Sequence, residues 1–266
     1  MRIGRLINVY VEAKVRALMT NNTAALSPEE AGLRAHPAPV ARFESVSPNK
    51  TDETGGSRGF SFALTPGSFH ILTGAPGSGK TSILRLLCMV ERPGRGRIQL
   101  FGRDVESMSR TEAAAARRRI GVMFPDLPLL EHLSVFENAA LVPRIAGRNR
   151  REYAPEVIEV LRWVGLGRKI DEKPTALTTG EKRCLAIARA VANGPEIVLA
   201  DEPTADLDTV SARRVLRLLA ELASSGATVL MATTDEGLAA TSGAQIMHLQ
   251  DGRLVLVEPA SPGLVP

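Results

Sequence analysis

The chain has 266 residues, of which 44% are hydrophobic and 23% are charged, a composition typical of a packed globular protein. These values exclude a chain that is disordered throughout, a collagen and a disulfide scaffold. The net charge of +4 is a mild excess, which permits contact with phosphates or an anionic membrane surface without requiring either. Seven Phe, two Tyr and one Trp offer few stacking surfaces for bases, which argues against a single-strand nucleic-acid binder.

Cysteine usage favours a protein of the cytosol, and hydropathy indicates that the chain does not span a membrane. Cys88 and Cys184 lie in apolar helical contexts without CxxC spacing, so we expect both to be reduced core residues. The sequence has no run of about 18 apolar residues, the length that a membrane-spanning helix needs.

The first 39 residues are expected to form an N-terminal extension. Over residues 1–19, apolar residues at helical spacing fit a short interfacial helix, an unstructured extension or a start of translation at Met19. Residues 20–39 are rich in Asn, Ala, Pro and Ser, which is typical of a linker. We therefore expect ordered structure to begin near Val40.

Strands and helices alternate along most of the remaining chain. The first predicted elements are strands at 41–47, 59–65 and 68–73, a glycine-rich turn with its helix at 74–90, strand segments at 97–105, a helix at 109–119 and a buried strand at 120–124. From 125 to about 179 the pattern is mainly helical, with a capping box at Ser134 and Glu137 and a helix at 155–166.

The α/β alternation resumes after Gly180. The predicted elements are a helix at 181–193, a strand at 196–201, a helix at 210–225, a strand at 227–233 and a hairpin at 245–257 that turns at Asp251 and Gly252. This alternation predicts parallel βαβ units, with ligands bound at the carboxyl ends of the strands.

A phosphate-binding motif occupies residues 74–81. The segment GAPGSGKT matches G-x-x-x-x-G-K-[ST], and it follows a predicted strand and opens a predicted helix. Its glycines allow backbone N–H groups to surround phosphate oxygens, and the helix N-terminus adds positive potential. In this motif Lys80 reaches the β- and γ-phosphates, and Thr81 places its hydroxyl on Mg²⁺. The alternative is a plain turn before a helix, which the matching context disfavours.

A second motif is the apolar strand at 197–200 that ends in Asp201 and Glu202. A carboxylate at the carboxyl end of a strand, beside a phosphate loop, is where an acid that holds Mg²⁺ belongs. We therefore predict that Asp201 holds Mg²⁺ through water and that Glu202 polarises the attacking water as general base. By itself an acidic pair after a strand is only a strand end, and the upstream phosphate loop is what favours the catalytic interpretation.

Between these motifs, LTTGE at 177–181 opens a helix. The second motif continues past Asp201 and Glu202 as DEPTADLD, over residues 201–208. With these pieces in this order, the sequence resembles the ATP-binding subunits of ABC (ATP-binding cassette) systems, in which LSGGE or LSGGQ stands at the LTTGE position. The resemblance implies an α/β fold of the P-loop NTPase type, the ABC ATPase core. This core has a RecA-like parallel sheet, an N-terminal antiparallel β subdomain and a helical subdomain.

The resemblance extends over residues 40 to about 255. It implies an ABC ATPase domain at 40–258, in which residues 126–179 approximately form the helical subdomain. Residues 259–266 are then a C-terminal tail.

Within the family the resemblance is to the FtsE cell-division group, carried by segments such as RRRIGVMFPDLPLLEHLSVFENAAL and EIVLADEPTADLD. It implies a subunit that binds and hydrolyses Mg-ATP as a dimer and drives an FtsX-like transmembrane subunit. Such a subunit lies at the cytoplasmic face of the inner membrane, peripheral to it. The sequence leaves open whether the dimer is a homodimer or a heterodimer.

Three other functions remain as alternatives. One is an ATP-gated scaffold with little hydrolysis, and another is the ATPase subunit of a related lipoprotein-release or export transporter. The third is a DNA-associated ABC-type ATPase, which only the pI of about 9.4 favours. Such ATPases resemble this family but carry a long inserted coiled coil, for which the interval from Lys80 to Asp201 leaves no room. We therefore expect no nucleic-acid partner.

The predicted site combines the motifs with what the resemblance implies. The catalytic residues are Lys80 and Glu202, and the metal-holding residues are Thr81 and Asp201. The nucleotide-binding residues are Gly74, Ala75, Pro76, Gly77, Ser78, Gly79, Lys80, Thr81, Ser82, Thr178, Gly180, Glu181 and Asp208. In the family the phosphate loop of one subunit faces the LTTGE segment of the other, so Thr178 is expected to contact the γ-phosphate across the dimer.

The chain departs from the family pattern at positions that sense the γ-phosphate or couple the site to its partner. Pro125 stands where the family has a Gln, and we hypothesise that Asp126 supplies an oxygen in its place. Thr234 stands at the position of the switch His, and Thr179 replaces a Gly. Lys50 occupies the position of the aromatic residue that stacks on adenine. We therefore expect ATP hydrolysis to be weak.

Histidines and arginines outside the motifs give a weaker signal. The four histidines lack metal-ligand spacing and are interpreted as surface or packing residues; they are His36, His70, His132 and His248. The run at 117–119 fits a solvated helix end or a surface that faces an anionic partner. Further arginines lie near where the family meets its membrane partner, at Arg144, Arg148, Arg150 and Arg151.

Overall fold

The computed structural model describes residues 38–47, 59–125, 128–250 and 252–257. The elements below lie in one compact unit that runs from Pro39 to Pro266. The expectations for residues 1–37, for the tail at 259–266 and for Lys50, Asp126 and Asp251 fall outside the described residues.

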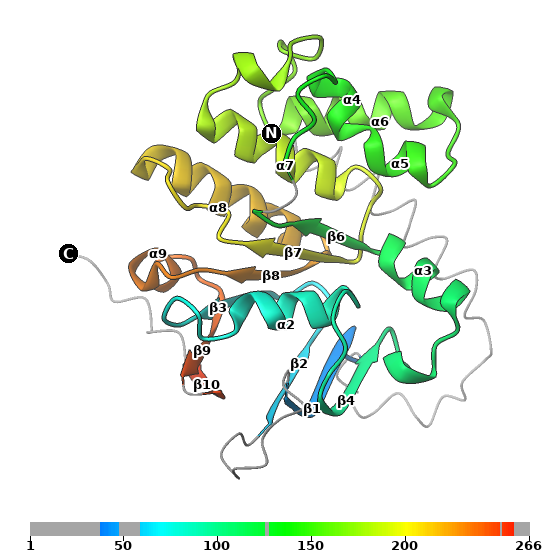
Figure 1. The fold of residues 1–266 in the computed structure, drawn as a ribbon. Coiled ribbons are helices and arrows are strands. Elements are labelled where there is room, and N and C mark those ends of the chain that lie inside the picture. Colours follow the sequence, from blue (N-terminus) through cyan, green and yellow to red (C-terminus); the bar gives the residue numbers. More distant parts are fainter. Residues whose placement is uncertain (1–37, 48–58, 126–127, 251, 258–266) are drawn as a thin grey trace, which may run out of the picture. The chain divides into compact units, whose positions relative to one another are not determined.

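A six-stranded sheet forms the centre of this unit (Figure 1), in the order β10-β9-β3-β8-β7-β6. Its strands are β3 (Phe69–Thr73), β6 (Ile120–Met123), β7 (Ile197–Asp201), β8 (Thr228–Ala232), β9 (Gln245–Gln250) and β10 (Arg253–Val257). Neighbouring strands from β9 to β6 pair in parallel, and β10 pairs antiparallel with β9. Every residue of β7 and β8 is buried, as expected of strands covered on both faces. Because β10 pairs antiparallel with β9, the two strands of the hairpin predicted over 245–257 are present.

A four-stranded antiparallel sheet, in the order β2-β1-β4-β5, precedes and follows the phosphate loop in sequence. Its strands are β1 (Ala41–Ser47), β2 (Phe60–Leu64), β4 (Arg95–Leu100) and β5 (Arg103–Asp104). The ring of Phe43 stacks against both Phe60 and Phe62, with centroids 5.9 and 4.5 Å apart. Such cross-strand aromatic pairs stabilise an antiparallel sheet. The predicted antiparallel subdomain is confirmed.

Helices cover both faces of the six-stranded sheet (Figure 1). Helix α2 (Lys80–Leu87) packs between the two sheets, because its apolar residues share one core with the four-stranded sheet and with β7 and β8. Helices α7 (Thr179–Val191) and α8 (Thr209–Ser224) pack into the other core, on the opposite face. The phosphate loop therefore lies where β3 ends and α2 begins, between two packed layers.

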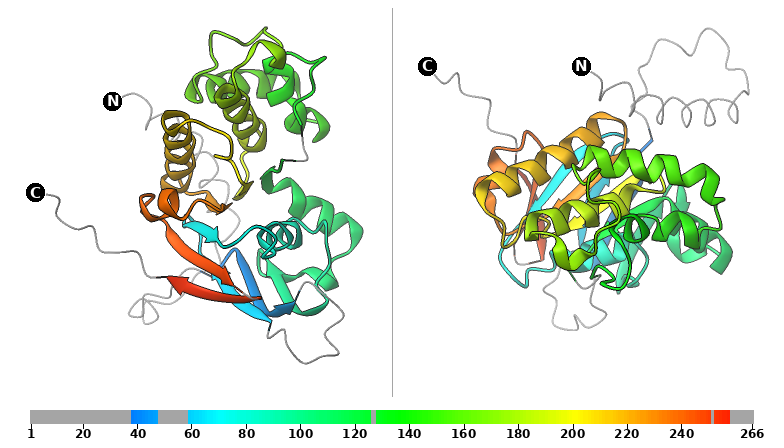
Figure 2. Two further views of the ribbon diagram at one scale, coloured as in Figure 1. Left: turned by 60° about the vertical axis from the view of Figure 1, so that its left-hand side comes forward. Right: turned by 90° about the horizontal axis from the view of Figure 1, so that it is seen from above.

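The segment between β6 and α7 is mainly helical, as predicted. It contains α4 (Val135–Ala139), α5 (Leu141–Ile145), α6 (Arg150–Trp163) and the 3₁₀ turn η3 (Pro174–Ala176). Figure 2 shows these helices grouped on the far side of α7 from the central sheet. The predicted capping box at Ser134 and Glu137 is present at the start of α4.

Helix α6 begins earlier than the sequence pattern indicated. The prediction placed its start at Pro155. The helix instead begins at Arg150, where the side chain of Asn149 accepts a hydrogen bond from the Arg151 N–H, and Pro155 lies inside it. A capping side chain has thus set the start of the helix in place of the proline.

The remaining helical elements are α3 (Arg110–Arg118), α9 (Glu236–Ala240) and the 3₁₀ turn η2 (Val105–Ser107). Within the described ranges, no helix has the length and apolar character that a membrane span requires.

Candidate functional site

The phosphate loop has the backbone shape that its sequence requires. Gly74 has a φ of 145°, and a Cβ at this position would lie 2.4 Å from the carbonyl oxygen of Leu249 on β9. Gly77 has a φ of 78°, and nothing lies within 4 Å of where its Cβ would be. The first glycine therefore permits close packing against β9, and the second leaves open space beside the exposed turn of the loop.

The Lys80 side chain is folded under this loop. It is only 6% exposed, and its Nζ donates hydrogen bonds to the carbonyl oxygens of Gly74 (2.7 Å) and Ala75 (3.0 Å). An ammonium group has three N–H donors, so the loop carbonyls engage two and one is left for a ligand. The lysine thus holds the loop and remains able to bind an anion.

Thr81 and Asp201 join the loop to the end of β7. The Thr81 hydroxyl donates a hydrogen bond of 2.8 Å to Oδ2 of Asp201. Asp201 is buried, with 3% of its surface exposed. Burial raises the pKa of Asp201, and the hydrogen bond from Thr81 opposes that shift. A buried carboxylate of this kind gains from a nearby cation.

These two oxygen ligands fit Mg²⁺ as a binding set. Mg²⁺ prefers hard oxygens and is held by one or two protein groups together with phosphate oxygens and water. Thr81 and Asp201 present a hydroxyl and a carboxylate side by side next to the loop. Among the described residues, no group of three or more His, Cys, Asp or Glu side chains forms a separate metal cluster.

Glu202 follows Asp201 in an uncommon backbone conformation. Its φ is 45°, in the left-handed region that non-glycine residues rarely adopt, and its N–H donates to the carbonyl oxygen of Ala232 on β8 (2.9 Å). The side chain is partly exposed, at the same sheet edge as the phosphate loop. Strained residues of this kind concentrate at functional sites.

Asp208 has a structural function in the described chain. Its Oδ1 accepts hydrogen bonds from the N–H groups of Val210 and Ser211 at the start of α8, and its Oδ2 accepts one from the Ser211 hydroxyl (2.6 Å). These bonds, led by those from Ser211, lower the pKa of Asp208. The residue is exposed, so it caps α8 while its outer edge stays open to a ligand or partner.

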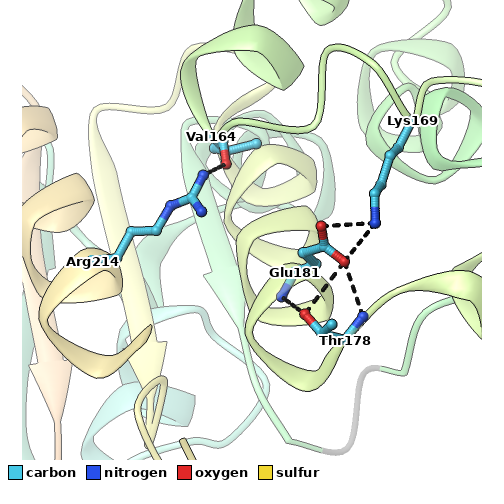
Figure 3. A network of polar contacts seen from close by, with 5 residues as sticks. All are labelled: Val164, Lys169, Thr178, Glu181 and Arg214. Carbon is cyan, nitrogen blue, oxygen red and sulfur yellow. Dashed lines mark hydrogen bonds and ion pairs between the residues drawn. The ribbon is translucent and has the colours of Figure 1, made fainter. Parts of the chain in front are cut away.

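The LTTGE segment forms the start of α7 (Figure 3). The Thr178 hydroxyl accepts from the Glu181 N–H, and the Glu181 carboxylate accepts from the Thr178 N–H at 3.0 Å, which is a complete capping box. The Lys169 Nζ lies 2.9 Å from the same carboxylate. The hydrogen bond from Lys169 is the main reason why the pKa of Glu181 is lowered. A Cβ at Gly180 would lie 2.9 Å from the Ser211 hydroxyl, so a glycine lets α7 approach α8.

Apart from Glu202, the predicted site residues thus fall into two groups. Lys80, Thr81, Asp201 and the loop that they hold are joined by hydrogen bonds, and Ser82 follows them in the first turn of α2. The second group comprises Thr178, Gly180, Glu181 and Asp208, at the starts of α7 and α8. Within the parts of the chain that the structure describes, no hydrogen bond or ion pair joins the two groups.

Three of the positions that depart from the family pattern are exposed. Pro125 follows β6, Thr179 is the first residue of α7, and Thr234 follows β8. At these positions the chain presents a ring without a donor and two short hydroxyl groups to the surroundings.

A cleft of about 620 Å³ opens beside the loop and brings in residues that the sequence interpretation missed. One wall is the loop from Gly74 to Ser78, and the other includes Thr234, Glu236 and His248. His248 was interpreted as a surface or packing residue, since its spacing carries no motif. Only the sheet order, in which β9 lies next to β3, places it here.

Comparison with known proteins agrees with this geometry. The model of the ABC transporter family matches residues 57–205. The chain is similar to the cell division ATP-binding protein FtsE of Escherichia coli K12, with 38% identity over 81% of this chain and 97% of that protein.

Solved structures with the same fold include the dimeric structure of MJ0796, a bacterial ABC transporter cassette. It is 27% identical, has a TM-score of 0.73, and the match covers 83% of this chain and 99% of that one. A second dimeric structure of MJ0796, in a post-hydrolysis state bound to ADP and Pi, is 28% identical and has a TM-score of 0.70. The match again covers 83% of this chain and 99% of that one. The predicted fold class, a P-loop NTPase with the ABC ATPase core, is confirmed.

Proposed function

Because this chain belongs to the family of ABC transporter ATP-binding subunits that includes the FtsE proteins, we propose that it binds and hydrolyses Mg-ATP as a dimer. In this proposal it drives an FtsX-like transmembrane subunit in cell division, from the cytoplasmic face of the inner membrane. The name of the E. coli relative supports the process, and the dimeric structures of MJ0796 support the assembly.

The observation that carries this proposal is the connected set formed by the loop, Lys80, Thr81 and Asp201. The lysine is held by two loop carbonyls, and the threonine is held by the buried aspartate. These bonds preorganise a cation, a hydroxyl and a carboxylate at one sheet edge before any ligand arrives. Preorganised groups lower the cost of stabilising charge in phosphoryl transfer.

In this mechanism each residue has a distinct task. The free N–H of Lys80 and the backbone N–H groups of the loop bind phosphate oxygens and orient them. Thr81 and Asp201 would hold Mg²⁺, which supplies charge neutralisation at the phosphates when it is bound. Glu202 would orient a water molecule and accept its proton as the water attacks. Thr178, Gly180 and Glu181 would close the site from the partner subunit, with Asp208 beside them.

A specific observation also favours the second candidate, an ATP-gated scaffold. Three exposed positions carry Pro125, Thr179 and Thr234 instead of the family's donor or glycine residues. Loss of one donor to a developing charge typically reduces the rate by about 10²–10³. A chain with these changes would bind ATP and dimerise but release little phosphate.

One experiment tests the proposed function and separates the two candidates. Phosphate release is measured with Mg-ATP for the wild type and for Glu202→Gln, and nucleotide binding and sedimentation are measured on the same samples. The ATPase proposal expects binding, dimer formation and release that Glu202→Gln removes. Binding and dimer formation without release in either protein would overturn the ATPase and leave the scaffold. Absence of ATP binding would overturn both.

The membrane partner needs a separate test. The chain is expressed with an affinity tag in its own host, and complexes are purified from detergent-solubilised membranes. The proposal expects an FtsX-like transmembrane subunit to be recovered in stoichiometric amount. Recovery of a lipoprotein-release or export permease in its place would assign the chain to that alternative group.

A further inference from the structure

The second wall of the cleft beside the phosphate loop contains an imidazole in a fixed setting. His248 lies on β9 and pairs directly with Thr73, the last residue of β3 before the loop begins. Its ring lines the same cleft of about 620 Å³ as residues 74–78 and Thr234. The side chain is 30% exposed, so the ring is anchored in the sheet and still reachable by a ligand in the cleft.

Both contacts of the ring are made by the same nitrogen. The Nδ1 atom lies 3.0 Å from the buried hydroxyl of Thr73 and 3.6 Å from Oε1 of Glu236. Within the described part of the chain, Nε2 has no hydrogen bond or ion pair. The ring therefore has one nitrogen that is held by the protein and one that is left for a ligand.

The hydrogen bond between Thr73 and Nδ1 decides which nitrogen of the ring carries the proton. When the Thr73 hydroxyl donates to Nδ1, the proton of a neutral imidazole must reside on Nε2, which then presents an N–H to the cleft that the phosphate loop also lines. In the opposite tautomer Nδ1–H is the donor and Nε2 is an acceptor.

Among the described residues that line the cleft, Glu236 is the acidic side chain, and by itself it would disfavour an anion. Its carboxylate lies 3.6 Å from Nδ1 of the imidazole. Thr234, at the switch position, contributes only a short neutral hydroxyl to this wall.

We propose that His248, held through Nδ1 by Thr73 and Glu236, donates from Nε2 to the terminal phosphate of bound ATP and replaces the imidazole that position 234 lacks. The inference rests on the proposed function, since it assumes that the phosphate loop binds ATP. It assigns His248 a direct contact with the nucleotide and makes Thr73 a positioning residue.

The test compares affinities for two nucleotides. Titration calorimetry on the full chain with Mg²⁺ gives the Kd for a non-hydrolysable ATP analogue, AMP-PNP, and for ADP. In His248→Ala we expect the AMP-PNP Kd to rise about tenfold, the value of one hydrogen bond to a charged group, while the ADP Kd changes by less than about twofold. The matched control is His132→Ala, which removes an exposed histidine outside the cleft.

Two further variants separate a donor from a structural effect. His248→Gln carries an amide N–H near the Nε2 position, so we expect it to recover most of the AMP-PNP affinity. The double variant His248→Ala with Thr234→His restores an imidazole to the same wall and is expected to recover affinity as well. His248→Thr, whose side chain favours a strand, repeats the truncation if the alanine variant does not fold.

The outcomes distinguish this inference from the function on which it rests. If wild-type protein binds no AMP-PNP, the proposed function fails and the inference fails with it. If wild-type binding depends on Lys80 but the truncations leave the AMP-PNP Kd unchanged, only the inference is overturned. An equal loss of ADP and AMP-PNP affinity, or a His248→Gln variant as weak as the alanine variant, would also overturn it.

Discussion

The two groups of predicted site residues differ in how the chain holds them. At the phosphate loop, Lys80 and Asp201 are buried and bonded to other parts of the same chain. At the start of α7, Thr178 is exposed and its bonds stay within a local network with Glu181 and Lys169 (Figure 3). One region is complete within a single chain, whereas the other presents polar groups outward.

This difference indicates what each region needs from a partner. Buried polar groups are costly unless they are hydrogen-bonded, and the phosphate loop meets that requirement by itself. The exposed start of α7 has capped its own backbone and still presents the Thr178 side chain and two small neighbours to a second surface. A second copy of the chain would bring such a surface to the phosphate loop, as the dimeric proposal requires.

Removing the buried cation should cause the largest loss. In Lys80→Ala the carbonyls of Gly74 and Ala75 lose their shared donor, and phosphate loses a charged ligand. We expect phosphate release to fall by about 10²–10³, together with weaker ATP binding. Calorimetry and phosphate release measure both. Lys173→Ala is the matched control, since Lys173 is exposed and its Nζ donates to the carbonyl oxygen of His132 in the helical segment. Equal losses in both variants would remove the special status of the loop.

Removing the candidate base should separate binding from hydrolysis. Glu202 occupies the strained position at the end of β7, and Glu202→Gln keeps its size and hydrogen-bonding capacity. We expect phosphate release to fall by about 10² or more, while ATP binding stays within about threefold of the wild type. Sedimentation with ATP should then show a persistent dimer. A variant that hydrolyses ATP at the wild-type rate would exclude Glu202 as the base.

Acid should destabilise the strand that carries the phosphate loop. His70 on β3 is 4% exposed, and neither ring nitrogen has a hydrogen-bond partner among the described residues. Burial lowers the pKa of His70 from 6.5 to about 4. The unfolded chain therefore binds a proton more readily between these values. Stability is fully present above pH 6.5 and is lost as the pH falls towards 4, by about 3 kcal/mol in total.

The variant His70→Leu should remove this part of the pH dependence. Leucine fits an apolar site and leaves no hydrogen bond broken, so the fold is expected to tolerate it. Urea unfolding at pH 7 and pH 5, followed by fluorescence of the single Trp163, gives the free energies. The difference between the two pH values should shrink in His70→Leu and not in His132→Ala. Identical pH profiles for the wild type and His70→Leu would contradict the assignment.

The sequence predicted what depends on neighbouring residues. The glycine-rich turn before α2, the capping box at Ser134 and the acidic end of β7 are local patterns, and each was located correctly. The start of α6 was misplaced, since the structure begins this helix at Arg150 with Asn149 as its cap. His248 could not be assigned to the cleft because its neighbour Thr73 is 175 residues away in sequence. Only the order of strands in the sheet brings them together.

The smallest expected effect concerns the ion pair that supports the start of α7. Lys169 lies in the loop after α6 and contacts the carboxylate that completes the capping box. In Lys169→Gln the box itself remains, but the carboxylate loses a partner that restrains it. A partly exposed ion pair at the surface contributes little, so we expect phosphate release to fall only about two- to fivefold.

The readout that separates the two regions is the affinity of the isolated chain for ATP. If the phosphate loop is complete within one chain, Lys169→Gln leaves the ATP Kd unchanged and weakens ATP-dependent dimer formation instead. Calorimetry at low protein concentration measures the first quantity, and sedimentation with ATP and Glu202→Gln in the background measures the second. Lys182→Gln, at an exposed site on α7, is the control. A weaker ATP Kd in the monomer would show that the start of α7 supports the phosphate loop within the same chain, which would remove the contrast between the two regions.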